Sequence, residues 1–485
     1  MRKKVLGTIA GLLAGAGGAF AQPPGPAPMS APQPVAESGA FDGNPQAQMS
    51  PYRRLVTPDG IPPVLPGPNP NAMPTPGGME GPPTYPPPGP YGQQMYETPK
   101  LKGMGLDNMG LFGGVRAAPR VWFDGQYLLM FPKNQPITVP LITTSAPADA
   151  GVLGRGSTSV LYGAADLPYG AASGFRMSAG FFRPQDQRLG FELGSIYLSP
   201  VSNNFYGQSG GNGVPVIARP FLNINGNAQN SVLAAFPTFA SGNILGRSTS
   251  EFWGMEASGL LNVFRTSPES LRAWSFNLLG GFRYLELAEG INISSASTIL
   301  GTFTAPYSGT TVANPGTITV MDDFSTRNQF YGGQVGFQSQ YYGGRWFLGL
   351  TAKAAVGLVQ EQLEISGLSG LNNPQLGVVS QAVGGVFANP SNVGKYTNDS
   401  FGYLGDLNGT IGFNVTSWLT LTGGYNFIYL NSVLRPGDQI NGRVDGTQIP
   451  TSINYGGAPV PRENLQLRTT SYYVHGVNFG FIVRY

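Results

Sequence analysis

The sequence predicts an all-β protein, a transmembrane up-and-down antiparallel β-barrel of about ten strands, with twelve as the alternative count. Apolar and polar residues alternate with period two in about ten segments between residue 115 and the end of the chain. The connections between these segments are alternately long and short. Period-two alternation is typical of strands with two different surroundings. An even strand number with both ends on one side of a membrane gives alternating connections.

The alternation separates an aromatic face from a small, polar face. The alternation is clearest between residues 274 and 284. The residues of the aromatic face there are Trp274, Phe276, Leu278, Phe282 and Tyr284, and those of the polar face are Ser275, Asn277, Gly281 and Arg283. A soluble β-sandwich also alternates, but its exposed face is usually rich in Lys and Glu. Here only 11% of all residues are charged, against about 25% in soluble domains. The apolar face is therefore expected to contact outer-membrane lipid.

The predicted strands and connections follow from this pattern. The predicted strands are 120–131, 173–182, 189–199, 248–264, 272–289, 327–341, 345–363, 400–413, 417–431 and 470–485. Long loops are expected at 132–172, 200–247, 290–326, 364–399 and 432–469, and short turns at 183–188, 265–271, 342–344 and 414–416. The long loops should lie outside the cell and the short turns in the periplasm. Gly-rich pieces of the long loops, such as 159–163, can hide the two extra strands of a twelve-stranded barrel.

The N-terminal region predicts secretion. Residues 1–21 have a basic start, an apolar core and an Ala19-Phe20-Ala21 cleavage site, which together indicate a signal peptide and a mature chain beginning at Gln22. Residues 22–114 are predicted to be a Pro-rich disordered linker, because Pro fixes φ and lacks an N–H. A tether for a cell-envelope partner and a passive spacer are both compatible with it, and the spacer is favoured. The barrel domain is placed at 115–485, in the bacterial outer membrane.

Composition narrows the classes of function. The net charge is +3 without a concentrated basic stripe, so no nucleic-acid partner is expected. Cys is absent, which excludes disulfides and thiolate metal sites. The single His475 falls on the predicted lipid side, with no catalytic partner indicated there. The adjacent acids Asp322 and Asp323 are interpreted as solvated loop charge rather than a Ca²⁺ site. No catalytic residue, cofactor or metal is predicted, and the chain is not expected to be an enzyme.

The inward face carries eight predicted charges of balanced sign. They are Asp124, Arg176, Glu192, Glu256, Arg283, Lys353, Asp406 and Arg484. Neighbouring strands supply opposite signs, so the expected pairs are Arg176 with Glu192, Glu256 with Arg283, Lys353 with Asp406, and Arg484 with Asp124. One interpretation is a selectivity lining of a pore. The favoured one is a paired ladder that plugs a narrow lumen, because buried charges need partners and small barrels are filled by side chains.

Aromatic residues mark the expected membrane boundary and the end of the chain. Trp274, Trp346 and Trp418 all flank predicted short turns, where they would form a periplasmic girdle. The last segment alternates toward a terminal aromatic residue, Tyr485. We expect this final strand to be the signal that the barrel-insertion machinery recognises.

Several motifs resemble the bacterial beta-barrel porin-7 family of outer-membrane proteins. They are Gly281-Phe282-Arg283-Tyr284-Leu285, Phe330-Tyr331-Gly332-Gly333-Gln334, Ser432-Val433-Leu434-Arg435-Pro436-Gly437-Asp438-Gln439-Ile440, Gly151-Val152-Leu153-Gly154 and Asn478-Phe479-Gly480-Phe481. The resemblance spans about 120–485, and the run Arg435–Gln439 is its most specific part. It implies a porin that passes small solutes passively, and this is the function that the sequence predicts first. Barrel size and balanced charge favour the alternative, a non-conducting structural or surface-interaction barrel.

Overall fold

The computed structural model describes residues 121–184, 187–266, 272–457 and 466–485. The predicted signal peptide (1–21), the Pro-rich linker (22–114) and the first residues assigned to the barrel domain lie outside the described residues. Within these described ranges, no helix is long and apolar enough to cross a membrane.

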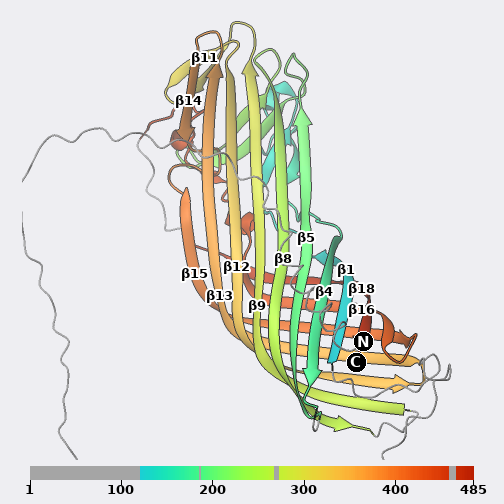
Figure 1. Cartoon of the computed structure of the whole chain (residues 1–485). Helices are drawn as coiled ribbons and strands as arrows, with labels where there is room; N and C mark the ends of the chain where they lie inside the picture. The colour runs from blue at the N-terminus through green and yellow to red at the C-terminus, as the bar shows by residue number, and fades with distance from the viewer. Residues whose placement is uncertain (1–120, 185–186, 267–271, 458–465) are drawn as a thin grey trace, which may run out of the picture. The chain divides into compact units, whose positions relative to one another are not determined.

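Ten strands form a closed antiparallel ring (Figure 1), in which each strand pairs with the next along the chain and β1 pairs with β18. The ring consists of β1 (Val121–Pro132), β4 (Ala172–Phe182), β5 (Leu189–Gln208), β8 (Ala240–Arg265), β9 (Arg272–Ile299), β12 (Thr317–Gly343), β13 (Trp346–Asn373), β15 (Gly394–Asn414), β16 (Leu419–Leu434) and β18 (Thr469–Arg484). All ten predicted strands are confirmed, and the ring has ten strands rather than twelve.

Two aromatic bands bound an exposed apolar belt on the outside of the ring. Trp274 and Tyr284 lie ten residues apart on β9, and Tyr341 and Tyr331 lie ten apart on β12. Tyr284 and Tyr331 touch, with ring centroids 5.0 Å apart. Ten residues rise about 33 Å, which a strand tilt of about 40° reduces to about 25 Å, the height of a lipid-facing band. The belt therefore fits one bilayer crossing.

The longest strands continue beyond the outer band, where their apolar face changes sides. On β9, Leu278 and Phe282 are exposed on the outward face, whereas Ile291 and Ile293 are fully buried on the inward face. Strands β5, β8, β12 and β13 also extend past the ends of β1, β4, β16 and β18 (Figure 1). Much of the predicted loops 290–326 and 364–399 is thus strand, which corrects the sequence interpretation. Beyond the bilayer, the outer surface of the ring faces water instead of lipid. The apolar side chains of the strands therefore lie on the inward face there.

A second sheet packs inside this extension. It consists of β2 (Pro140–Thr144), β3 (Ser159–Gly163), β6 (Ile217–Asn223), β7 (Ala228–Ala235) and β17 (Arg443–Val444). The predicted extra strand at 159–163 is therefore real, but it belongs to this sheet and not to the ring. The two layers share one buried core that includes Leu141, Phe221 and Ile293. The shorter strands β10 (Thr304–Tyr307), β11 (Thr310–Ala313) and β14 (Val378–Val383) complete the outer part.

The prediction that Asp322 is a solvated loop residue is wrong. It lies on the inward face of β12, fully buried, and forms an ion pair with Arg219 of β6. Its carboxylate also accepts hydrogen bonds from the backbone N–H groups of Val386, Phe387 and Ala388. The carboxylate therefore connects the barrel wall, the inner sheet and the segment after β14, since buried polar groups are generally hydrogen-bonded.

Candidate functional site

The lumen is crossed by an apolar layer at the level of the outer aromatic band. All ten strands of the ring contribute at least one buried side chain to it (Leu128, Met130, Ala172, Ile196, Leu198, Phe252, Leu285, Leu287, Phe330, Ala355, Val359, Leu404, Ile428, Leu430, Val433, Tyr472 and Val474). Phe252 of β8 stacks on Tyr472 of β18, with ring centroids 6.0 Å apart. Because three strands separate β8 from β18 in the ring, this contact spans the interior. The layer therefore packs side chains from all ten strands against one another across the interior.

A cluster of six charges lies directly beneath the apolar layer. It has three cations, Arg176, Arg283 and Lys353, and three anions, Glu192, Glu256 and Asp406, and none of these side chains is more than 12% exposed. Arg176 Nη2 lies 2.6 Å from Asp406 Oδ2, and Arg283 Nη1 lies 2.8 Å from the same oxygen. Lys353 Nζ lies 2.6 Å from Glu256 Oε1. The cluster is neutral in sum, which satisfies the requirement for burying charge.

The pairing within the cluster differs from the predicted ladder between neighbouring strands. Arg176 binds Asp406 and Glu256 instead of Glu192. Lys353 lies opposite Asp406 in the strand register but binds Glu256 and Glu192. The predicted contact of Glu256 with Arg283 is present, at 3.6 Å. Long side chains reach across a narrow lumen. The ion-pair partners of Arg176 and Lys353 are therefore charges from more distant strands rather than the residues directly opposite on the neighbouring strand.

The absence of a side chain at Gly194 makes room for the Glu256 carboxylate. Gly194 of β5 lies opposite Glu256 of β8, and a Cβ atom at Gly194 would be 2.8 Å from Glu256 Oε1. The missing side chain lets Glu256 lie along the wall and reach Lys353 and Arg283. Sequence reasoning on charges alone could not identify this position, because Gly carries no chemical signal.

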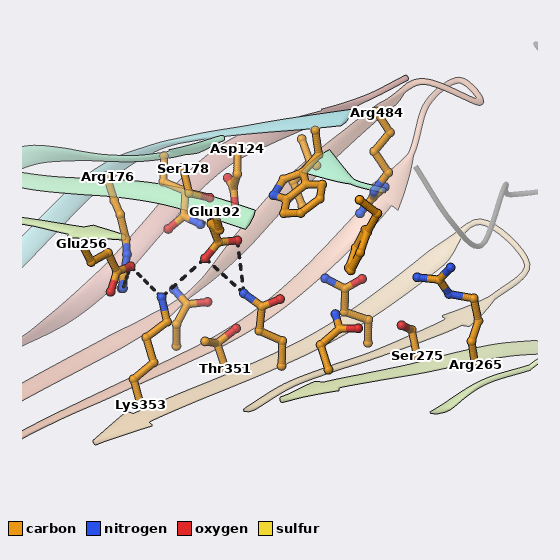
Figure 2. A pocket seen from close by; sticks show the side chains of 18 residues that line it. Asp124, Arg176, Ser178, Glu192, Glu256, Arg265, Ser275, Thr351, Lys353 and Arg484 are labelled. Atoms are coloured by element: carbon orange, nitrogen blue, oxygen red, sulfur yellow. Dashed lines mark hydrogen bonds and ion pairs between the residues drawn. The ribbon is translucent and has the colours of Figure 1, made fainter. Parts of the chain in front are cut away.

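A polar cavity of about 110 Å³ lies on the short-turn side of the cluster (Figure 2). Asp124 and Arg484 both line it, but they do not form the predicted ion pair. Arg484 donates to Thr420 Oγ1 at 2.6 Å and lies over the rings of Tyr342 and Phe347. Asp124 accepts a hydrogen bond from Gln126 Nε2 at 3.0 Å. Within the described part of the chain, Asp124 is the one predicted lumen carboxylate without an ion pair.

Arg435, from the most specific motif, holds the connection after β16 across the interior. Its side chain is fully buried, binds both carboxylate oxygens of Glu289 on β9, and donates to the carbonyl oxygen of Asn134 at 2.7 Å. Asn328 of β12 bonds the backbone N–H and carbonyl of Leu434. The short helix α2 (Pro436–Gln439) follows directly. The motif therefore lies above the apolar layer as a strap, a role that sequence reasoning missed.

Other candidate chemistry is sparse. His475 lies at the outer surface of β18, where its Nδ1 is 2.7 Å from the Tyr425 hydroxyl oxygen and its ring contacts Phe131 and Tyr473. In the ranges that the structure describes, no group of three or more His, Cys, Asp or Glu side chains is placed to hold a metal ion.

The closed ring of ten strands and the exposed apolar belt define a transmembrane β-barrel of the outer-membrane type. The family model described as "Putative beta barrel porin-7 (BBP7)" matches residues 122–485, and the chain belongs to this family.

Similar chains exist among solved structures, whereas no curated protein matches the sequence. The outer-membrane protease OmpT from Escherichia coli is 9% identical, with a TM-score of 0.32, over 75% of this chain and 96% of its own. The P. putida toluene transporter TodX is 7% identical, with a TM-score of 0.17, over 75% and 90%. Neither likeness informs the function proposed below.

Proposed function

We propose that this protein is a non-conducting barrel of the bacterial outer membrane, which anchors and presents its folded outer part, and that it is not an enzyme. The observation that carries the proposal is the apolar layer across the lumen, where Phe252 stacks on Tyr472 from the far side of the ring. Ions pass a hydrophobic constriction only if it is wetted. Beneath that layer lie six paired and buried charges, so a hydrated solute would have to cross both the apolar layer and the ion cluster.

The second candidate is a porin that passes small solutes passively, and membership in the porin-7 family favours it. In this case the strap around Arg435 and the apolar layer must move aside. The charge cluster would then line the pore and set its selectivity.

Liposome swelling distinguishes the two candidates. Liposomes carrying the full-length protein are transferred into an isotonic arabinose solution, where a sugar-permeable pore causes swelling and a drop in turbidity. We expect no swelling beyond that of empty liposomes, with a general porin as the positive control. Swelling at the porin rate would support the porin instead.

A further inference from the structure

The cavity on the short-turn side of the charge cluster has the properties of a ligand site. Its polar lining includes Asp124, Gln126 and Glu192, and an apolar part is formed by Trp122, Phe182 and Ile482. A cavity of about 110 Å³ is large enough for a few waters or one small solute, since a water needs roughly 10–15 Å³ measured in this way. A closed barrel needs no such cavity, so the inference goes beyond the proposed function.

Two acceptor atoms in this cavity have no partner. Asp124 Oδ1 and Gln126 Oε1 are both buried and form no hydrogen bond, although Gln126 Nε2 donates to the other oxygen of Asp124. The cations that line the cavity have other contacts. Arg176 binds Asp406, Lys353 binds Glu256, and Arg484 donates to Thr420. Arg265 donates to Gln187 and lies over the Phe182 ring, so Trp122 offers the aromatic face to a ligand. Orphaned buried acceptors carry a full desolvation penalty, which a donor from a ligand would remove. The missing group is therefore a hydrogen-bond donor, and a positively charged one suits the carboxylate.

The aromatic side of the cavity narrows the ligand class. Trp122 and Phe182 lie together with ring centroids 5.3 Å apart, and both line the same cavity as Asp124. Aromatic faces next to a carboxylate are suited to organic ammonium groups, which combine charge with an apolar body. We propose that the cavity binds a small primary amine in its ammonium form, with the nitrogen on Asp124 and Gln126 and the carbon chain against Trp122.

Ethylammonium is a suitable probe, because it has a donor group and a short alkyl body. The full-length protein in detergent micelles is titrated with ethylammonium chloride, and binding is followed by saturation-transfer NMR on the ligand signals. With three non-hydrogen atoms, the ligand should bind no tighter than about millimolar. Ethanol, its neutral analogue, should show no saturable signal. Competition by sodium chloride at equal concentration would show that any monovalent cation fills the site, which would overturn the ammonium assignment.

Variants locate the site. Asp124→Asn should weaken ethylammonium binding by about tenfold or more, since a charge-assisted hydrogen bond is lost. Asp323→Asn is the matched control, because Asp323 lies on the outward face of β12, away from the cavity, and should bind as the wild type does. If Asp124→Asn fails to fold, Gln126→Leu replaces it and should also weaken binding. No saturable binding by the wild type would show that the cavity holds water only, and equal binding by the variants would place ethylammonium elsewhere; either result would overturn the proposal.

Discussion

Arg435 and Glu289 form a two-point ion pair inside the barrel, with Arg435 Nε 2.8 Å from Oε2 and Nη2 2.7 Å from Oε1 of Glu289. Both side chains are fully buried. Glu289 belongs to β9, whereas Arg435 belongs to the connection between β16 and β18. The pair therefore fixes this connection on the opposite wall of the lumen, above the apolar layer.

Removing Arg435 should destabilise the barrel strongly. Arg435→Met leaves Glu289 charged and buried without a partner, which costs about 3–5 kcal/mol. The double variant Arg435→Met with Glu289→Gln should recover much of this loss, because no orphan charge remains. The measurement is urea-induced unfolding of the refolded barrel in detergent, followed by heat-modifiable migration on a gel.

The control is an ion pair at the protein surface. Lys395 and Glu364 lie 3.2 Å apart with side chains 78% and 51% exposed. Lys395→Met should cost about 1 kcal/mol or less, because solvent screens the pair. Similar losses of unfolding free energy for Lys395→Met and Arg435→Met would contradict the role of Arg435 in holding the connection across the lumen.

The charge cluster makes a separate prediction about partners. Arg283 Nη1 lies 2.8 Å from Asp406 but 3.6 Å from Glu256. In double-mutant cycles on urea unfolding, Arg283→Met should couple more strongly to Asp406→Asn than to Glu256→Gln, because Arg283 lies closer to Asp406 and each carboxylate keeps one further cation at 2.6 Å. Equal coupling, or stability unchanged by Arg283→Met, would indicate a hydrated lumen.

A charged residue introduced on the lipid-facing belt should destabilise the barrel most near the middle of the bilayer. Val335 is 66% exposed and lies between the two aromatic bands on β12. Val335→Arg should destabilise the folded barrel in lipid by about 2–4 kcal/mol, as expected near the bilayer midplane. Thr319→Arg, at the same outward parity on β12 but beyond the outer band, should cost about 1 kcal/mol or less. Equal costs in urea unfolding from liposomes would place the membrane boundary elsewhere.

The ten strands were predictable because lipid imposes a simple rule on their outward faces. Residues such as Phe282 and Tyr425 must be apolar, and their neighbours such as Arg283 and Asn426 need not be. The outer halves of β9 and β12 were missed because the rule reverses there. Beyond Tyr284, the buried set continues at Leu285, Leu287 and Ile291, so an alternation read in one phase ends too early. A search for a phase reversal would have found these extensions.

The lumen was less predictable than the wall. Alternation selected the inward charges, including Arg283 and Asp406, but register alone could not tell which charges meet across the barrel. The packing of Phe252 against Tyr472 joins strands that are far apart in the ring, and no local pattern encodes that contact. The importance of Arg435 was visible as a motif, while its partner Glu289 lies 146 residues away in sequence.

The orientation of the barrel gives a prediction in whole cells. An epitope tag inserted after Gly377, at the tip between β13 and β14, should bind antibody on intact cells. The matched insertion after Thr416, in the short turn between β15 and β16, should bind only after the outer membrane is permeabilised. The reverse pattern would invert the topology.

Single-channel recording in planar bilayers tests most directly whether the lumen is closed. Full-length protein inserted into a bilayer in 1 M potassium chloride should give no discrete conductance steps, because the apolar layer of all ten strands excludes hydrated ions. Insertion is verified by recovering folded, heat-modifiable protein from the same proteoliposomes. Regular, long-lived steps from the wild-type protein would contradict the closed barrel and establish the porin.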